Sequence, residues 1–183
     1  MIDLTKKILP SAVEVEGRFY KIKTDFQYWL NFALKRKKGE IKFLSDCDFL
    51  YLNEIPENRE KGIEKLIEFC DSRNELPRAI SGSGKILIDF ELDSDLIYSA
   101  FLEVYGIDLI DSDLHLHWFK FNALFDSLHG TKLNEVMGYR GFDENDKTSY
   151  EKSMIRMRQA WEIPAVLSEE ERKALDDFDS KLK

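Results

Sequence analysis

The sequence is poor in the residues that special structures and chemistries require. Its only cysteines, Cys47 and Cys70, have no C-x-x-C neighbour, so we expect two buried free thiols rather than a disulfide or a metal site. Four prolines and nine glycines exclude collagen-like and low-complexity chains. No apolar run approaches the ~18 residues of a membrane-spanning helix, and the charges in residues 1–7 argue against a signal peptide. These absences predict a cytosolic protein without a membrane partner.

Positive charge is in deficit as well. The chain has 27 Lys and Arg against 35 Asp and Glu, which gives a net charge of −8. An acidic balance removes the usual electrostatic basis for binding nucleic acid. The basic run at residues 35–38 lies at the end of a predicted helix, where cations complement the helix dipole. We therefore expect no nucleic-acid partner.

The chain does have enough apolar residues to form a core. Of its 183 residues, 43% are apolar and 13% are aromatic, which excludes intrinsic disorder. The pattern predicts a mainly α-helical fold with a short N-terminal β-hairpin, which is α+β by strict count. We expect a single domain over residues 1–140, with a flexible connection near residues 73–85, and a C-terminal helical appendage over residues 141–183.

The first third of the chain opens with the predicted hairpin. β-Forming residues predict it over residues 13–23, with a turn at Glu16-Gly17-Arg18. A helix follows, capped by Thr24 or Asp25 and ended by Gly39. Three weaker elements come next: helices over residues 45–54 and 58–71, and an extended stretch over 86–92 that could add to the hairpin.

The tetrapeptide Asp-Ser-Asp-Leu occurs twice, at residues 93–96 and 111–114, each time before an apolar run. Asp and Ser side chains accept hydrogen bonds from the free N–H groups of a helix N-terminus, so both copies are interpreted as N-caps. The predicted helix over residues 113–128 is apolar on most sides, which indicates the centre of the core. The other predicted helices cover residues 97–104, 131–137, 147–161 and 168–182, and the last opens with an S-x-x-E capping pattern.

No constellation points to a catalytic, cofactor-binding or metal-binding residue. His115 and His117 are two residues apart and project about 200° from each other on a helix, so they could not bind one ion there. Asp113 and His117, four residues apart, could bind one metal ion together, but Asp113 is better explained as a helix N-cap. Residues 81–85 resemble a phosphate-binding loop, yet they lack its first Gly and its final Ser or Thr. The Asp pairs of the repeated tetrapeptide are also interpreted as caps, so we expect no enzymatic activity and no cofactor.

Two groups of motifs resemble the bacteriophage gp-fifteen family. The first group is Leu9-Pro10, Val13-Glu14-Val15-Glu16-Gly17 and the run from Tyr20 to Thr24-Asp25-Phe26, followed by Trp29. The second group is Asp95–Phe101, Tyr105–Leu109, Leu116–Leu124 and Tyr139-Arg140. The resemblance implies a protein of long-tailed phages or prophages of Gram-positive bacteria, typically encoded close to the tape-measure gene. It also implies a tail assembly chaperone in the host bacterial cytoplasm, without defined catalytic residues.

A chaperone of this kind would cover the apolar stripes of the helix-rich tape-measure protein, its expected partner, with an amphipathic helix or an apolar groove. The candidate contact residues are Tyr28 and Phe32 on the outer face of the first long helix, and Leu175, Phe178 and Leu182 on the last helix. Packing of Tyr28 and Phe32 within their own domain is an equal alternative, and self-association through the last helix is another.

Two other functions stay open on the sequence alone. The first is a structural tail or connector component that is retained in the virion. The second is a metal-dependent enzyme that uses His115 or His117, which would require a bound ion.

Overall fold

A computed structural model describes residues 2–72, 86–142 and 149–163. The described residues form two compact units. The first unit contains residues 2–72 and 95–134, and the second contains residues 86–94 together with residues 135–142 and 149–163. Each unit is described by itself below. The predicted connection at residues 73–85 and the predicted helix over 168–182 lie outside the described residues.

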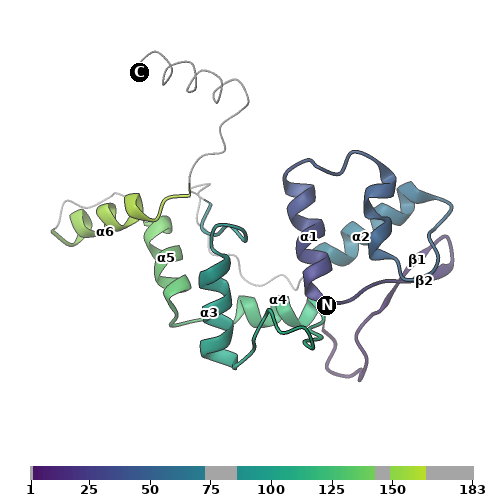
Figure 1. The fold of residues 1–183 in the computed structure, drawn as a ribbon, viewed down its shortest axis with the longest axis horizontal. Helices are drawn as coiled ribbons and strands as arrows, with labels where there is room; N and C mark the ends of the chain where they lie inside the picture. Colours follow the sequence, from purple (N-terminus) through teal and green to yellow (C-terminus); the bar gives the residue numbers. More distant parts are fainter. Residues whose placement is uncertain (1, 73–85, 143–148, 164–183) are drawn as a thin grey trace, which may run out of the picture. The chain divides into compact units, whose positions relative to one another are not determined.

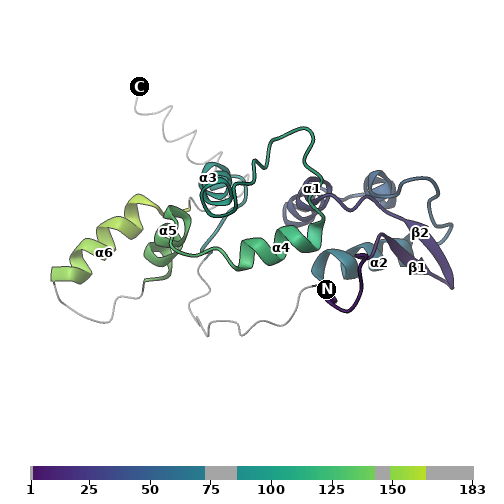
Figure 2. The ribbon, with the colours of Figure 1, turned by 90° about the horizontal axis from the view of Figure 1, so that it is seen from below.

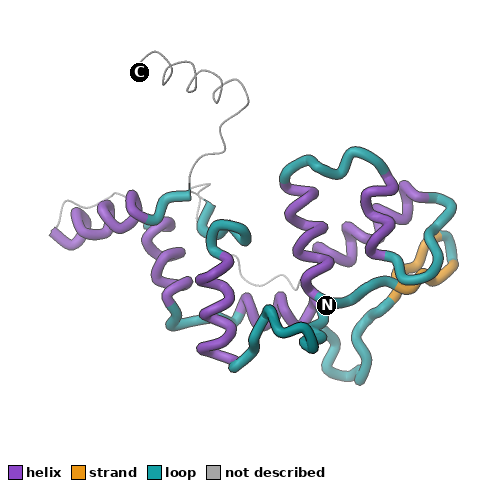
Figure 3. Tube along the Cα trace, viewed as in Figure 1, coloured by secondary structure: helices purple, strands orange, loops and turns teal. Residues whose placement is uncertain are grey.

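The fold is mainly helical, as predicted (Figures 1 and 3). Its elements are, in order, β1 (Ala12–Val15), β2 (Arg18–Lys21), α1 (Phe26–Lys37), the 3-10 helix η1 (Leu44–Leu50), α2 (Arg59–Asp71), α3 (Ser94–Tyr105), α4 (Trp118–Asp126), α5 (Lys132–Gly141) and α6 (Ser149–Ala160). The two strands form one antiparallel sheet. Among the described residues, no helix is both long enough and apolar enough to cross a membrane.

The hairpin confirms its prediction. β1 and β2 pair from Ala12 with Lys21 to Val15 with Arg18, and a two-residue turn joins them. Both turn residues have positive φ, 52° at Glu16 and 81° at Gly17. This is the backbone of a type I′ turn, whose twist matches that of the strands.

Residues 86–92 do not add a strand to the hairpin, so that prediction was wrong. The side chain of Asp89 accepts hydrogen bonds from the N–H groups of Glu91 and Leu92, at 3.0 and 3.1 Å. Such local bonds fold the backbone into a turn and compete with strand pairing.

Two predicted helices are shorter than expected because distant backbone competes for their residues. The helix predicted over residues 45–54 ends at Leu50, since the next residues extend alongside β2. There the N–H of Lys23 donates to Leu50 at 2.8 Å, and the N–H of Leu52 donates to Lys21 at 3.0 Å. The helix predicted over residues 113–128 begins only at Trp118, so Asp113 is not its N-cap.

Two other helices begin at side-chain caps, of which the cap by Asp25 was predicted. Asp25 caps α1, whose last turn carries Lys35, Arg36 and Lys37, as expected from the helix dipole. Asn58 caps α2, where its side chain accepts from the N–H of Lys61. Both helices therefore begin at a side-chain cap.

Aromatic rings form the core of the first unit, and α4 contributes Trp118, Phe119 and Phe121 to it. Phe121 of α4 stacks on Phe26 and on Phe101, with ring centroids 4.6 and 5.2 Å apart. Phe69 of α2 contacts Trp29 at 4.5 Å and Phe119 at 4.6 Å. Stacked aromatic pairs add to the stabilisation that burial of their area provides.

The two cysteines are buried free thiols, as predicted. Cys47 is 1% exposed and Cys70 is 3% exposed. Burial, together with the neighbouring carboxylates of Asp46 and Asp48, raises the pKa of Cys47 to about 11. A thiol with such a pKa is protonated at neutral pH and reacts poorly.

Replacing Gly17 by alanine should destabilise the protein by about 1 kcal/mol, because only glycine adopts positive φ without cost. The added Cβ would meet no atom within 4 Å, so the expected loss is a backbone effect. Gly138→Ala is the matched control, because its Cβ also meets nothing but lies within helix α5. That variant should be stabilised by up to about 1 kcal/mol. Urea unfolding followed by circular dichroism measures both, and an unchanged Gly17→Ala variant would contradict the turn assignment.

Candidate protein-binding surfaces

Two helices of the first unit begin at one backbone bridge, between Asp25 and His117. One carboxylate oxygen of Asp25 accepts from the N–H of Gln27 at 3.1 Å and caps α1, while the other accepts from the N–H of Leu116 at 3.1 Å. Nδ1 of His117 accepts from the N–H of Phe119 at 3.1 Å and caps α4. Each residue of the bridge therefore caps its own helix.

The second ring nitrogen of His117 ties the N-terminal segment to this junction. Since Nδ1 accepts a hydrogen bond, the ring proton is on Nε2, which donates to the carbonyl of Pro10 at 2.9 Å. Burial lowers the pKa of His117 from its ordinary value, although the Pro10 carbonyl acts in the opposite direction. The residue is thus held as a neutral imidazole with both nitrogens in use.

The predicted helical placement of His115 and His117 was wrong, because both precede α4. His115 is exposed, while His117 is partly buried at the junction. In the part of the chain that the structure describes, no group of three or more His, Cys, Asp or Glu side chains could hold a metal ion.

His117→Asn should reduce the pH dependence of stability. In the wild type the folded state has the lower His117 pKa, so the unfolded state binds the proton more readily and stability falls as pH drops below about 6.5. Asparagine keeps an N-cap acceptor but does not titrate. The free energy of unfolding between pH 7.5 and 5.5 measures the effect, and an equally steep fall in the variant would contradict it.

His117→Ala provides the complementary measurement. Loss of the cap should cost about 1 kcal/mol at pH 7.5. His115→Ala is the control, because this neighbouring histidine is exposed and should change stability by less than about 0.5 kcal/mol.

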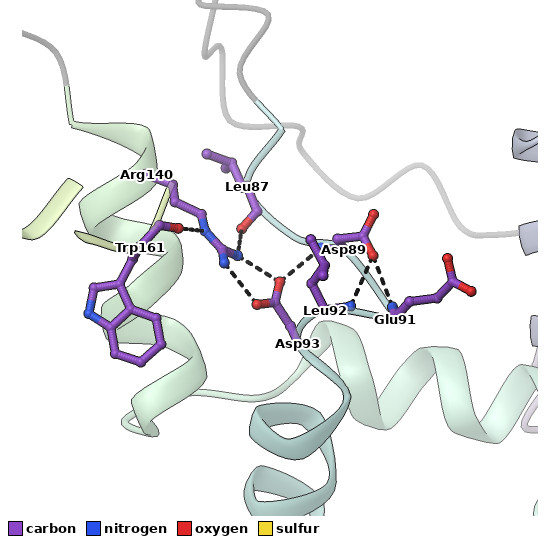
Figure 4. Close-up of polar contacts among 7 residues, drawn as sticks. All are labelled: Leu87, Asp89, Glu91, Leu92, Asp93, Arg140 and Trp161. Atoms are coloured by element: carbon purple, nitrogen blue, oxygen red, sulfur yellow. Dashed lines mark hydrogen bonds and ion pairs between the residues drawn. The ribbon is translucent and has the colours of Figure 1, made fainter. Parts of the chain in front are cut away.

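The second unit contains a buried ion pair between Asp93 and Arg140 (Figure 4). The two residues are 3% and 7% exposed. Arg140 donates to both carboxylate oxygens, at 2.6 and 2.8 Å, and also to the carbonyls of Leu87 and Trp161, at 3.0 and 2.7 Å. The N–H of Asp89 donates to Asp93 at 2.9 Å. One guanidinium thus joins the segment before α3, helix α5 and the residue after α6.

The predicted role of Asp93 as an N-cap was wrong, because its carboxylate is engaged by Arg140. Burial alone would raise the pKa of Asp93, but the hydrogen bonds from Arg140 and Asp89 outweigh it and lower the pKa. The pair therefore stabilises the fold above the ordinary carboxyl pKa, and this contribution is lost as pH falls through the lowered value. Its bidentate geometry, with all three guanidinium nitrogens hydrogen-bonded, indicates a structural clamp.

Asp93→Asn should destabilise the protein by about 3 kcal/mol, because it leaves a buried arginine without its counter-charge. Asp95→Asn is the matched control, since Asp95 belongs to the same tetrapeptide but is exposed. That variant should lose less than about 1 kcal/mol, the value of a carboxylate in a first helical turn. Denaturant unfolding of both variants tests the difference, and equal losses would contradict a buried clamp.

An open groove of about 570 Å³ lies between β1 and α2 in the first unit. Helix α2 lies against β1 (Figure 2). Three buried residues, Val13, Phe69 and Phe119, line the groove with the exposed ring of Pro10. Its charged lining residues are Glu14, Glu16, Lys65 and Glu68. The volume is in the range of ligand-binding clefts, roughly 300–1,000 Å³, and sequence patterns gave no signal for it.

A second surface, the outer hairpin face, consists of Phe19, Lys21 and Leu52. Phe19 and Lys21 flank Tyr20, the buried residue of β2, and therefore point away from the core. Leu52 lies beside Lys21, because the neighbouring residues Ile22 and Tyr51 form a bridge. Phe19 is 70% exposed and Leu52 is 52% exposed. Exposed apolar side chains that lie together are typical of protein interaction sites.

The residues predicted to contact a partner differ in where the structure places them. Phe32 is fully buried and contacts Trp29, so its expected place on an outer face was wrong. Tyr28 is 40% exposed, with the Lys23 ammonium 4.4 Å from its ring centroid, and its role in partner binding stays a prediction. Leu175, Phe178 and Leu182 lie outside the described residues.

The fold and these surfaces define a small, mainly helical protein with an N-terminal β-hairpin. Residues 4–163 match the family model described as Bacteriophage Gp15 protein. The match covers most of the chain, which therefore belongs to the bacteriophage Gp15 protein family. Neither the comparison with curated proteins nor that with solved structures gave a match.

Proposed function

We propose that the protein is a non-enzymatic tail assembly chaperone that covers the tape-measure protein in the host bacterial cytoplasm. Family membership over residues 4–163 is the observation that carries this proposal, since it makes the chain a phage-related protein. The resemblance in its motifs supplies the tail-assembly role.

The physical requirement for this role is a weak, reusable apolar surface on a soluble carrier. A long helix-rich protein exposes apolar stripes until the tail tube encloses it. Phe19 and Leu52 of the outer hairpin face offer exposed apolar contacts of the kind that such stripes need. The net charge of −8 opposes aggregation of the carrier itself.

Co-expression with the tape-measure protein of the same phage tests the proposal. The chaperone should co-purify with the tape-measure protein and increase its soluble fraction. Phe19→Asp combined with Leu52→Asp should weaken this association at least about tenfold, as expected when an apolar contact is replaced by charge. Leu4→Asp is the control, because Leu4 is 95% exposed and lies outside the outer hairpin face.

The contrary results are equally clear. Absence of co-purification together with an unchanged soluble fraction would count against the role. Mass spectrometry of purified virions distinguishes a chaperone from a structural component, because a chaperone should be absent from the particle. Stoichiometric amounts there would favour a structural tail or connector component.

A further inference from the structure

The free edge of β1 opens onto the groove between β1 and α2. In an antiparallel hairpin with a two-residue turn, Val15 and Arg18 form a hydrogen-bonded pair, and the pairs then alternate along the strands. The hydrogen bond from the N–H of Ile22 to the carbonyl of Ser11 fits this alternation, because these two residues would form the next hydrogen-bonded pair but one. Ala12 and Glu14 consequently direct their N–H and C=O groups away from β2.

These edge groups have no partner within the described residues. No hydrogen bond of that part of the chain reaches the backbone of Ala12 or Glu14. The groove is lined by residues of β1 and α2, but by none of β2, so it lies on the free side of β1. An unpaired strand edge is a template for another extended chain.

We propose that this groove binds an extended peptide segment with alternating apolar and basic side chains, which adds to β1 as a third strand. Backbone hydrogen bonds to Ala12 and Glu14 supply the register of the added strand. A helix would gain nothing from this edge, since its own backbone groups are already paired. A second hairpin backed by its own helix is too bulky, because α2 bounds the other side of the groove.

The charges of the groove select the side chains of the segment. Its lining carries three glutamates and one lysine, a net charge of −2. Lys65 is paired with Glu68, and Glu16 is paired with Lys61, whereas Glu14 forms no ion pair with any residue that the structure describes. Side chains of a strand alternate between faces. Apolar side chains on the face of Val13 would contact Phe69 and Phe119, and basic ones on the other face would meet Glu14.

The test uses a fluorescent peptide of alternating valine and lysine, about eight residues long, with the full-length protein. Anisotropy should show saturable binding that weakens as salt is added. A peptide of alternating valine and glutamate should bind at least about tenfold more weakly, and so should one with its valines and lysines in separate blocks. Amide exchange should show new protection at Ala12 and Glu14 when the first peptide is bound.

Ala12→Pro removes an edge donor that the hairpin itself does not use, so peptide affinity should fall about tenfold. Phe19→Pro is the matched control, because Phe19 pairs with Glu14 and presents its N–H at the opposite edge. That variant should bind the peptide normally, and circular dichroism checks that both variants are folded. Glu14→Lys is a second test that leaves the backbone intact, and it should reverse the preference between the lysine and glutamate peptides.

Equal binding by wild type and Ala12→Pro, or protection only at other residues, would overturn the proposal. So would a wild-type dimer that Ala12→Pro converts to a monomer, because the occupant would then be a second copy. The inference does not depend on the tail-assembly role. A failed peptide experiment leaves co-purification with the tape-measure protein untouched, and the reverse also holds.

Discussion

The backbone N–H groups at a helix N-terminus have no partner within the helix. In this protein the N-termini of two helices obtain side-chain acceptors at the same backbone bridge. Asp25 and His117 cap α1 and α4, and they form a backbone bridge although they are far apart in the chain. The bridge sets where both helices begin. Phe26, the first residue of α1, stacks on Phe121 in the first turn of α4, and this contact follows from that common start.

The candidate binding groove depends on the same junction. Nε2 of His117 holds the carbonyl of Pro10, which leads into β1 and lines the groove. Phe119, whose N–H is capped by His117, lines it as well. The aspartate and histidine of the family motifs thus act as structural residues, and the surfaces that they position are the parts available to a partner.

The repeated tetrapeptide shows how one local sequence acquires two roles. In the first copy, Asp93 is buried against Arg140 and joins the segments of the second unit. In the second copy, Asp111 accepts from the N–H of Asp113 at 2.9 Å and closes an exposed turn. The difference is due to Arg140, which is distant in sequence and provides a counter-charge for one copy.

The sequence by itself determined the features that depend on neighbours along the chain. These are the turn at Glu16 and Gly17, the cap at Asp25, the two buried thiols and the family motifs. Tertiary structure alone decided the start of α4, the end of η1, the burial of Phe32, the Asp93 clamp and the groove beside β1. A residue pattern shows which side chains avoid water. It does not show which distant backbone group or charge will compete for them, because that partner comes into reach only when the chain has folded.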